Sequence, residues 1–123
     1  MDRRIEELIS DLHADPYRRR TTAEMAEILN LSPSHLRELF KGATGKSLMR
    51  YLRDLRMQRA KELLDTSHLR IKEIVTEVGM NNVVPFLRAF KRAYGLTPTQ
   101  YRSRSPIAKT PKTKPARRGS QKS

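Results

Sequence analysis

The sequence predicts an all-α protein with about seven helices, and two observations support this prediction. Between residues 47 and 65, apolar residues recur at steps of three and four while charged residues fill most other positions, which is typical of a long amphipathic helix. These apolar residues are Leu48, Tyr51, Leu52, Leu55, Ala60, Leu63 and Leu64. A second pattern repeats with an offset of 50 residues, as FKGATGKSLMRY over 40–51 and FKRAYGLTPTQY over 90–101. We therefore expect a duplicated helical unit whose two copies are joined by the long helix.

The composition favours a partner with many negative charges. The 123 residues include 26 lysines and arginines against 13 acidic residues, for a formal net charge of +13. This excess points to nucleic acid before membrane. The absence of cysteine excludes disulfides, thiol catalysis and sulfur-ligated zinc, and no apolar run approaches the length of a membrane span. We expect a soluble, cytoplasmic protein with room for one compact domain, or for two small ones that share a helix.

The first subdomain is expected over residues 1–46, and it begins with a helix over 2–13. Apolar residues at i, i+3, i+4 and i+7 give this helix one buried face. They are Ile5, Leu8, Ile9 and Leu12. Thr21 and Glu24 have the spacing of a capping box, in which each side chain accepts a hydrogen bond from the other residue's backbone N–H, so a second helix should start there.

A short turn then separates the second helix from a third. Asn30 tolerates the left-handed conformation of a tight turn. Ser32 and Pro33 have the order of an N-cap and a first-turn proline. The residues that we expect to face inward from the third helix are Leu36, Leu39 and Phe40. Helix, short turn and helix make a helix-turn-helix motif.

The same arrangement returns after the linker helix of residues 47–65, in a second subdomain expected over 66–102. Gly79 occupies the turn of this second motif. If Asn82 is the N-cap of the next helix, Pro85 falls in its first turn, where no intrahelical donor is needed. The apolar faces before and after the turn are formed by Ile71, Ile74, Val75, Val78, Phe86, Ala89 and Phe90.

The end of the chain changes character. Thr97 and Pro98 start a last short helix that carries Tyr101. From Ser103 onward there are seven basic residues and no acid, and the helical periodicity disappears. We expect residues 103–123 to form a disordered basic tail.

Residues that support catalysis or metal binding are sparse. His13, His35 and His68 have no partner at metal-ligand spacing, and the acids lie mostly beside arginines on solvated helix faces. Gly42 and Gly45 belong to a helix end and not to the strand-to-helix turn of a phosphate-binding loop. We expect neither an enzyme nor a bound metal or cofactor.

A basic chain with two helix-turn-helix motifs has a direct mechanical interpretation. A recognition helix fits the major groove of DNA, and side chains near its N-terminus reach the base edges. The alternative is that the helices are merely packed together, as in any small bundle. The duplication and the charge favour DNA over that alternative.

Three stretches of the chain carry a more specific signal: SPSHLRELFKGATGKSLMRYLRDLRMQRAKELL, IKEIVTEVGM and FLRAFKRAYGLTPTQYR. They resemble the DNA-binding domain of AraC/XylS-type transcription regulators, over residues 5–102. The resemblance implies a homeodomain-like, monomeric module in which two helix-turn-helix units enter successive major grooves of double-stranded DNA.

The resemblance also implies, position by position, which residues read bases. In the first unit they are Ser34, Arg37 and Glu38, and in the second they are Asn82, Val83, Val84 and Arg88. We expect phosphate contacts from Lys41, Lys46, Lys91 and Arg92. RNA polymerase is the expected protein partner.

The chain departs from the family pattern in its second unit. Val75 stands where the family usually has alanine, and Met80 where it usually has phenylalanine. Val84 and Pro85 stand where serine with an aromatic residue is common. The offset of 50 residues sets Val84 against Ser34, and apolar side chains read chiefly the thymine methyl group. We hypothesise an asymmetric site of roughly 20 base pairs whose second half is richer in A·T pairs. The alternative is that Val83 and Val84 turn inward to fill space left by Met80.

The favoured function is sequence-specific DNA binding that regulates transcription. Two other functions stay open: a nonspecific or architectural nucleic-acid binder whose tail supplies affinity, and a truncated competitor of a larger regulator. The ratio of specific to nonspecific affinity distinguishes the favoured function from nonspecific binding. A specific binder typically binds its own site about a thousandfold or more tightly than other DNA at physiological salt.

Overall fold

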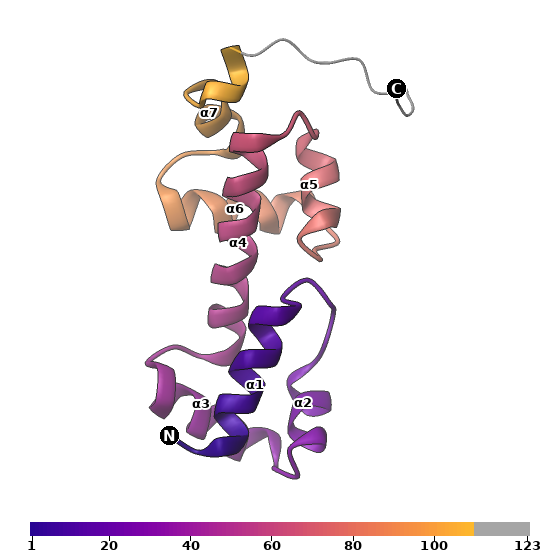
Figure 1. The fold of residues 1–123 in the computed structure, drawn as a ribbon, viewed down its shortest axis with the longest axis vertical. Coiled ribbons are helices and arrows are strands. Elements are labelled where there is room, and N and C mark those ends of the chain that lie inside the picture. Colours follow the sequence, from indigo (N-terminus) through magenta and orange to yellow (C-terminus); the bar gives the residue numbers. More distant parts are fainter. Residues whose placement is uncertain (110–123) are drawn as a thin grey trace.

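The computed structural model describes residues 1–109, and all regular structure in this part of the chain is helical (Figure 1). Seven α-helices are followed by one 3-10 helix, η1. They are α1 (Arg3–Ala14), α2 (Thr22–Ile28), α3 (Pro33–Thr44), α4 (Leu48–Thr66), α5 (Ile71–Glu77), α6 (Val83–Tyr94), α7 (Pro98–Ser103) and η1 (Pro106–Lys109). The predicted all-α fold is confirmed.

α4 runs along the long axis of an elongated molecule, and the other helices gather at its two ends (Figure 1). We call α1–α3 the N-terminal unit and α5–α7 the C-terminal unit. α4 ends at Thr66 with Ser67 as its C-cap, one residue beyond the expected segment of 47–65.

Each unit has its own hydrophobic cluster, and α4 contributes residues to both. The first cluster consists of Ile5, Leu8, Leu12, Met25, Ala26, Leu36, Phe40, Leu48 and Leu52. The second cluster consists of Met57, Ala60, Leu63, Leu64, Ile74, Val75, Val78, Phe86, Ala89 and Phe90. Eight of the ten residues predicted to face inward in the two helix-turn-helix motifs are therefore in these clusters. The other two, Leu39 and Ile71, are partly buried and pack against them.

α4 buries different faces at its two ends. Leu52 is its last member of the first cluster and Met57 is its first member of the second. Five residues turn an α-helix by about 500°, which is about 140° beyond one full turn. The two units therefore attach to different sides of α4. The apolar stripe predicted from the sequence omits Met57, although Met57 is fully buried, because one stripe cannot describe a helix that serves two cores.

The predicted starts of α2 and α3 are confirmed. The backbone N–H of Thr21 donates to Glu24 Oε1 at 2.7 Å, and the N–H of Glu24 donates to Thr21 Oγ1 at 3.0 Å. Ser32 Oγ accepts from the N–H of His35 at 3.1 Å. Asn30 lies in the left-handed region with φ of 61°. Together these residues build the expected helix-turn-helix motif of the N-terminal unit.

The turn of the C-terminal unit also follows the prediction. Gly79 has a φ of 82°, Asn82 is the N-cap of α6, and Pro85 lies in the first turn of that helix. The side chain of Asn82 makes no capping hydrogen bond. α6 therefore begins without the side-chain cap that Ser32 gives α3.

The prediction that the chain is disordered from residue 103 is wrong for residues 103–109. The N–H of Arg104 donates to Tyr101 O at 3.1 Å, Ser105 is buried, and η1 packs against α4 and α7. Helical periodicity cannot reveal a 3-10 turn of four residues that is held by packing against another element. The rest of the predicted tail, residues 110–123, lies outside the described residues.

Candidate nucleic-acid interface

α3 presents one polar stripe to solvent. Four of its exposed residues have a spacing of three, one and three positions, which places them on one face. They are Ser34, Arg37, Glu38 and Lys41. Leu36 and Phe40 anchor the inner face of the helix in the first cluster. The stripe begins in the first turn of α3, which is the end that reaches base edges when a helix-turn-helix docks on DNA.

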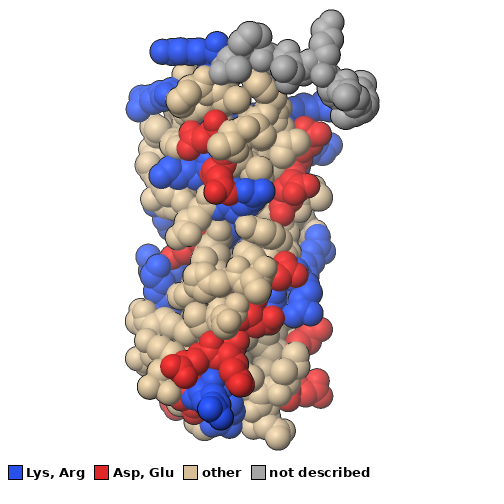
Figure 2. Space-filling model, viewed as in Figure 1, with Lys and Arg blue, Asp and Glu red and all other residues tan. Residues whose placement is uncertain are grey.

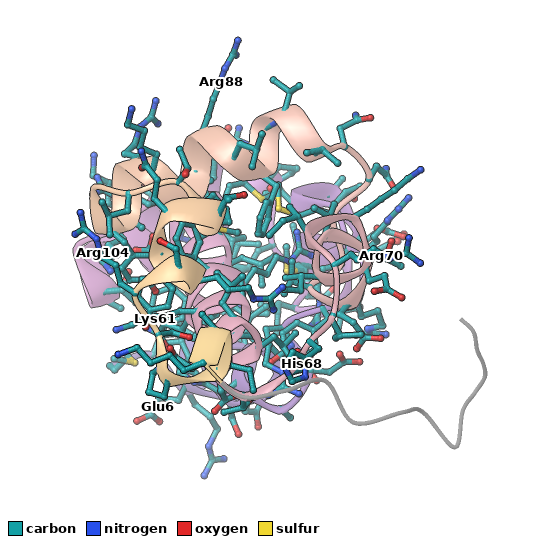
Figure 3. The ribbon with its side chains drawn as sticks, turned by 90° about the horizontal axis from the view of Figure 1, so that it is seen from above. Glu6, Lys61, His68, Arg70, Arg88 and Arg104 are labelled. Carbon is teal, nitrogen blue, oxygen red and sulfur yellow. The ribbon has the colours of Figure 1, made fainter. Side chains whose placement is uncertain are left out.

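α6 crosses behind α4 in Figure 1 and presents a second stripe. Its exposed residues include Val84, Arg88, Lys91 and Arg92. Arg88 points away from the body of the molecule (Figure 3). Phe86 and Phe90 hold the inner face in the second cluster.

The two valines at the start of α6 differ in their surroundings. Val83 is half-buried and packs against the second cluster, whereas Val84 is 57% exposed. The alternative that both valines turn inward therefore holds for Val83 and fails for Val84. Asn82, just before them, is exposed.

Positive charge gathers on the outer side of α6. This helix contains three basic residues and no acid, and α3 contains Glu38 as its only acid. Figure 2 shows the side on which α1 lies, where basic and acidic side chains are interspersed. Glu6 of α1 and Arg88 of α6 lie on opposite sides of the molecule (Figure 3). A polyanion is therefore attracted to the α6 side more than to the α1 side.

The four residues predicted to contact phosphate are not in equivalent surroundings. Lys41, Lys91 and Arg92 are exposed in the C-terminal halves of α3 and α6. Lys46 follows the end of α3, and its Nζ lies 2.7 Å from Asp54 Oδ2 of α4. A phosphate at Lys46 would have to compete with this carboxylate.

A model of a helix-turn-helix domain family matches residues 25–104, more than half of the chain. The chain belongs to the AraC-type helix-turn-helix family. It is 37% identical over 79 residues to the Msm operon regulatory protein of Streptococcus mutans, a match that covers 64% of this chain and 28% of the relative. The arabinose operon regulatory protein of Escherichia coli is 35% identical over 106 residues, with coverage of 84% and 36%. The chain thus spans only part of the length of these curated relatives.

Solved structures of the family share the architecture. The C-terminal domain of AraT, a response regulator from Geobacillus stearothermophilus, superimposes with a TM-score of 0.79 and is 33% identical, over 85% of this chain and 88% of that one. The DNA-binding domain of AdpA, a global transcriptional factor whose structure was solved with a target DNA, gives a TM-score of 0.76 at 22% identity. That match covers 80% of this chain and 89% of AdpA's, and it concerns the fold alone.

In this AraC-type chain, two side chains of α7 form hydrogen bonds with the C-terminal end of α4 and the residues that follow it. Arg102 donates to four backbone carbonyls that follow or end α4. The acceptors are Leu63, Leu64, Ser67 and Leu69. Tyr101 donates to Asp65 Oδ2 at 2.7 Å, and burial together with this carboxylate raises the pKa of Tyr101 to about 12. Tyr101 therefore stays protonated and holds α7 on α4 at neutral pH.

The sequence does not single out Arg56 among the charged residues that lie between the apolar positions of the linker helix. Arg56 is half-buried, and its Nε donates to Pro16 O at 2.9 Å. Burial, followed by the nearby charges of Arg20 and Arg19, lowers the pKa of Arg56. No sequence signal reveals this role, because the point at which α4 passes from one core to the other is visible only in the fold.

The described residues contain no group of three or more histidines, aspartates or glutamates placed to hold a metal ion. His13 instead lies against α4, with Nε2 at 2.7 Å from the Tyr51 hydroxyl. No helix within residues 1–109 is long and apolar enough to cross a membrane.

Proposed function

We propose that the chain binds specific sequences of double-stranded DNA, with α3 and α6 in successive major grooves, and thereby regulates transcription. The observation that supports this is the exposed stripe on each of the two helices, held in place by fully buried residues on the opposite face. Side chains fixed in this way can meet base edges at defined positions. Membership in the AraC-type family supports the same function.

In the first half-site, Arg37 and Glu38 supply hydrogen bonds to bases. An arginine pairs with guanine O6 and N7, and a glutamate accepts from cytosine N4, each contributing about 1–3 kcal/mol of discrimination. Within the described residues no ion pair joins Arg37 to Glu38. Both side chains are therefore available to bases, and Ser34 adds a hydroxyl one turn earlier.

In the second half-site, the reading residues are of mixed chemistry. Asn82 can pair with adenine, Arg88 with guanine, and Val84 can contact a thymine methyl group. Val83 presents only its exposed edge, because the rest of the side chain packs against the second cluster. We infer an asymmetric operator of roughly 20 base pairs, in which the half read by α6 is richer in A·T pairs.

The remaining parts of the proposal concern binding mode and partners. Lys41, Lys91 and Arg92 neutralise phosphates of the DNA. Lys46 does so as well once its ion pair with Asp54 is replaced by a contact with a DNA phosphate. One chain carries both reading helices, so a monomer can occupy two adjacent grooves. RNA polymerase is the protein partner that a transcription regulator of this kind would address, and the cytoplasm is where it would act.

The proposed function is tested by selecting bound fragments from random DNA and measuring their affinity at physiological salt. We expect one enriched site of about 20 base pairs, bound at least about a thousandfold more tightly than unrelated DNA. Arg88→Ala should reduce this ratio. Arg70→Ala removes the same charge at the N-cap of α5, away from Arg88 (Figure 3), and should not reduce it. A ratio near one for the unsubstituted protein would indicate a nonspecific or architectural binder instead.

A further inference from the structure

The loop between α1 and α2, residues 15–20, contacts the C-terminal unit although its helices belong to the N-terminal unit. Pro16 is buried, and the half-buried Tyr17 packs against the second cluster. At the other end, the buried side chain of Arg20 donates to Asp11 Oδ2 of α1 at 2.6 Å. We call residues 15–20 the brace loop, because it is tied to both units. In Figure 1 this loop lies next to the turn that follows α5.

Arg56 fastens the brace loop to the middle of α4. Its Nε donates to Pro16 O at 2.9 Å and its Nη2 donates to Arg18 O at 3.4 Å. Among the described residues no carboxylate forms an ion pair with Arg56, and Arg19 and Arg20 lie close enough to repel its charge. Burying a guanidinium without a counter-ion costs free energy, and the hydrogen bonds to these two carbonyls offset part of that cost. The brace loop therefore supplies the acceptors that Arg56 needs in this position.

Gly79 supplies an independent observation at the same contact. A Cβ atom at this position would lie 2.1 Å from Tyr17 O, far inside van der Waals contact. The left-handed turn does not by itself require glycine, since Asn30 adopts φ of 61° in the corresponding turn of the N-terminal unit. The close approach of the brace loop is therefore what excludes a side chain at Gly79.

We propose that Arg56 and the brace loop fix the distance and angle between α3 and α6, which makes Arg56 a positioning residue for half-site spacing. This inference rests on the proposed function, because half-site spacing matters only if both helices read DNA.

The need for such a contact follows from the geometry of DNA. Two recognition helices that meet successive major grooves must stand about 34 Å apart, on the same face of the duplex. A long helix by itself curves and bends, and α4 is the only helix that joins the two units in the described structure. The brace loop connects the units a second time, at the point where α4 passes from the first cluster to the second.

The first test measures tolerance to altered spacing. Arg56→Met keeps an unbranched apolar stem and removes the donors, and the control Arg59→Met removes the same charge one turn later, where the arginine pairs with Glu62. Affinity is measured for the selected site and for copies with one base pair inserted or removed between the halves. We expect the unsubstituted protein and Arg59→Met to lose at least about tenfold on the altered sites, and Arg56→Met to lose no more than about threefold.

The second test needs no DNA. The chain has no cysteine, so Glu27→Cys on α2 and Thr76→Cys on α5, both at exposed positions, provide two unique sites for spin labels. The distribution of distances between the labels should broaden with Arg56→Met and should be unchanged with Arg59→Met. It should also broaden with Gly79→Asn, which keeps a residue suited to the left-handed turn but adds the colliding Cβ atom.

The outcomes separate this inference from the proposed function. An unchanged distance distribution in both Arg56→Met and Gly79→Asn overturns it, and so does an undiminished spacing penalty in Arg56→Met. If Arg56→Met does not fold, the same two measurements, the spacing penalty and the distribution of label distances, are made on Gly79→Asn, which leaves Arg56 in place. Their outcome then decides whether the brace loop fixes the relation between the two units. If the unsubstituted protein selects no site from random DNA, the proposed function fails while the label distances still test the brace loop.

Discussion

Arg37 and Lys41 lie one helical turn apart on the exposed face of α3, yet we expect them to contribute differently to binding. Arg37 is nearer the helix N-terminus, where side chains reach bases, and its paired donors match guanine. Arg37→Ala should relax the preference at one or two adjacent base pairs by about 1–3 kcal/mol. Binding to all single-base-pair variants of the selected site measures this.

Lys41→Ala is the matched control for Arg37→Ala. It should weaken binding to every sequence alike and lower the slope of log affinity against log salt by about one, because it removes one phosphate contact. An equal loss on all sequences for Arg37→Ala would instead make Arg37 a second phosphate contact.

Val84 permits a chemical test of the asymmetric operator. Its side chain is exposed, and it is expected to read thymine through the methyl group. Replacing thymine by uracil in one half of the site removes methyl groups and leaves every hydrogen-bonding group in place. Affinity should fall when the half bound by α6 is substituted and should barely change for the other half. Unchanged affinity after substitution of the half bound by α6 would show that Val84 contacts no thymine methyl group.

At the scale of single helices, α4 gives the sharpest stability prediction. Met57 is fully buried in the second cluster, so Met57→Ala should lower the free energy of unfolding by about 2–5 kcal/mol. Met49, on the same helix, is 46% exposed, and Met49→Ala should change the free energy by no more than about 0.5 kcal/mol. Urea denaturation followed by circular dichroism measures the free energy of unfolding of both variants. A small change for Met57→Ala would mean that the second cluster repacks and fills the space left by the methionine side chain.

The helix starts and turns could be predicted from the sequence because they depend on local chemistry. A capping box needs only Thr21 and Glu24 at the right spacing, and the left-handed turns need only Asn30 and Gly79. Long-range packing left no such local signal. Met57 breaks the stripe expected of α4, and η1 is ordered because it packs against α4, so neither could be read from periodicity.

At the scale of the whole molecule, the same limit applies to the candidate site. The exposed stripes of α3 and α6 follow from helical spacing once the buried residues are known, so Ser34, Arg37 and Arg88 were predictable as outward residues. The relation between the stripes was not, because it depends on contacts between the brace loop, Arg56 and Gly79 that are far apart in sequence. The charge on Arg56 suggested solvent exposure, and only the fold reveals its carbonyl partners.

The last prediction concerns the basic C-terminal end, and the fold changes where a truncation should be made. Removal of residues 103–123 would also remove Ser105 and η1, which pack on the C-terminal unit. A change in DNA affinity could then come either from lower stability or from the lost positive charge. Removal of residues 110–123 takes away five lysines and arginines and leaves this packing intact.

Each neutralised phosphate contributes roughly 0.9 to the slope of log affinity against log salt, so the truncation at Lys109 should lower that slope by at most about 4.5. The ranking of DNA sequences and the melting temperature should not change, because the proposed reading residues and both hydrophobic clusters lie within residues 1–109. The truncation at Arg102 should lower the melting temperature as well. If the shorter deletion keeps the full slope but scrambles the ranking of sequences, the basic end contributes to base recognition and the division between reading helices and tail is wrong.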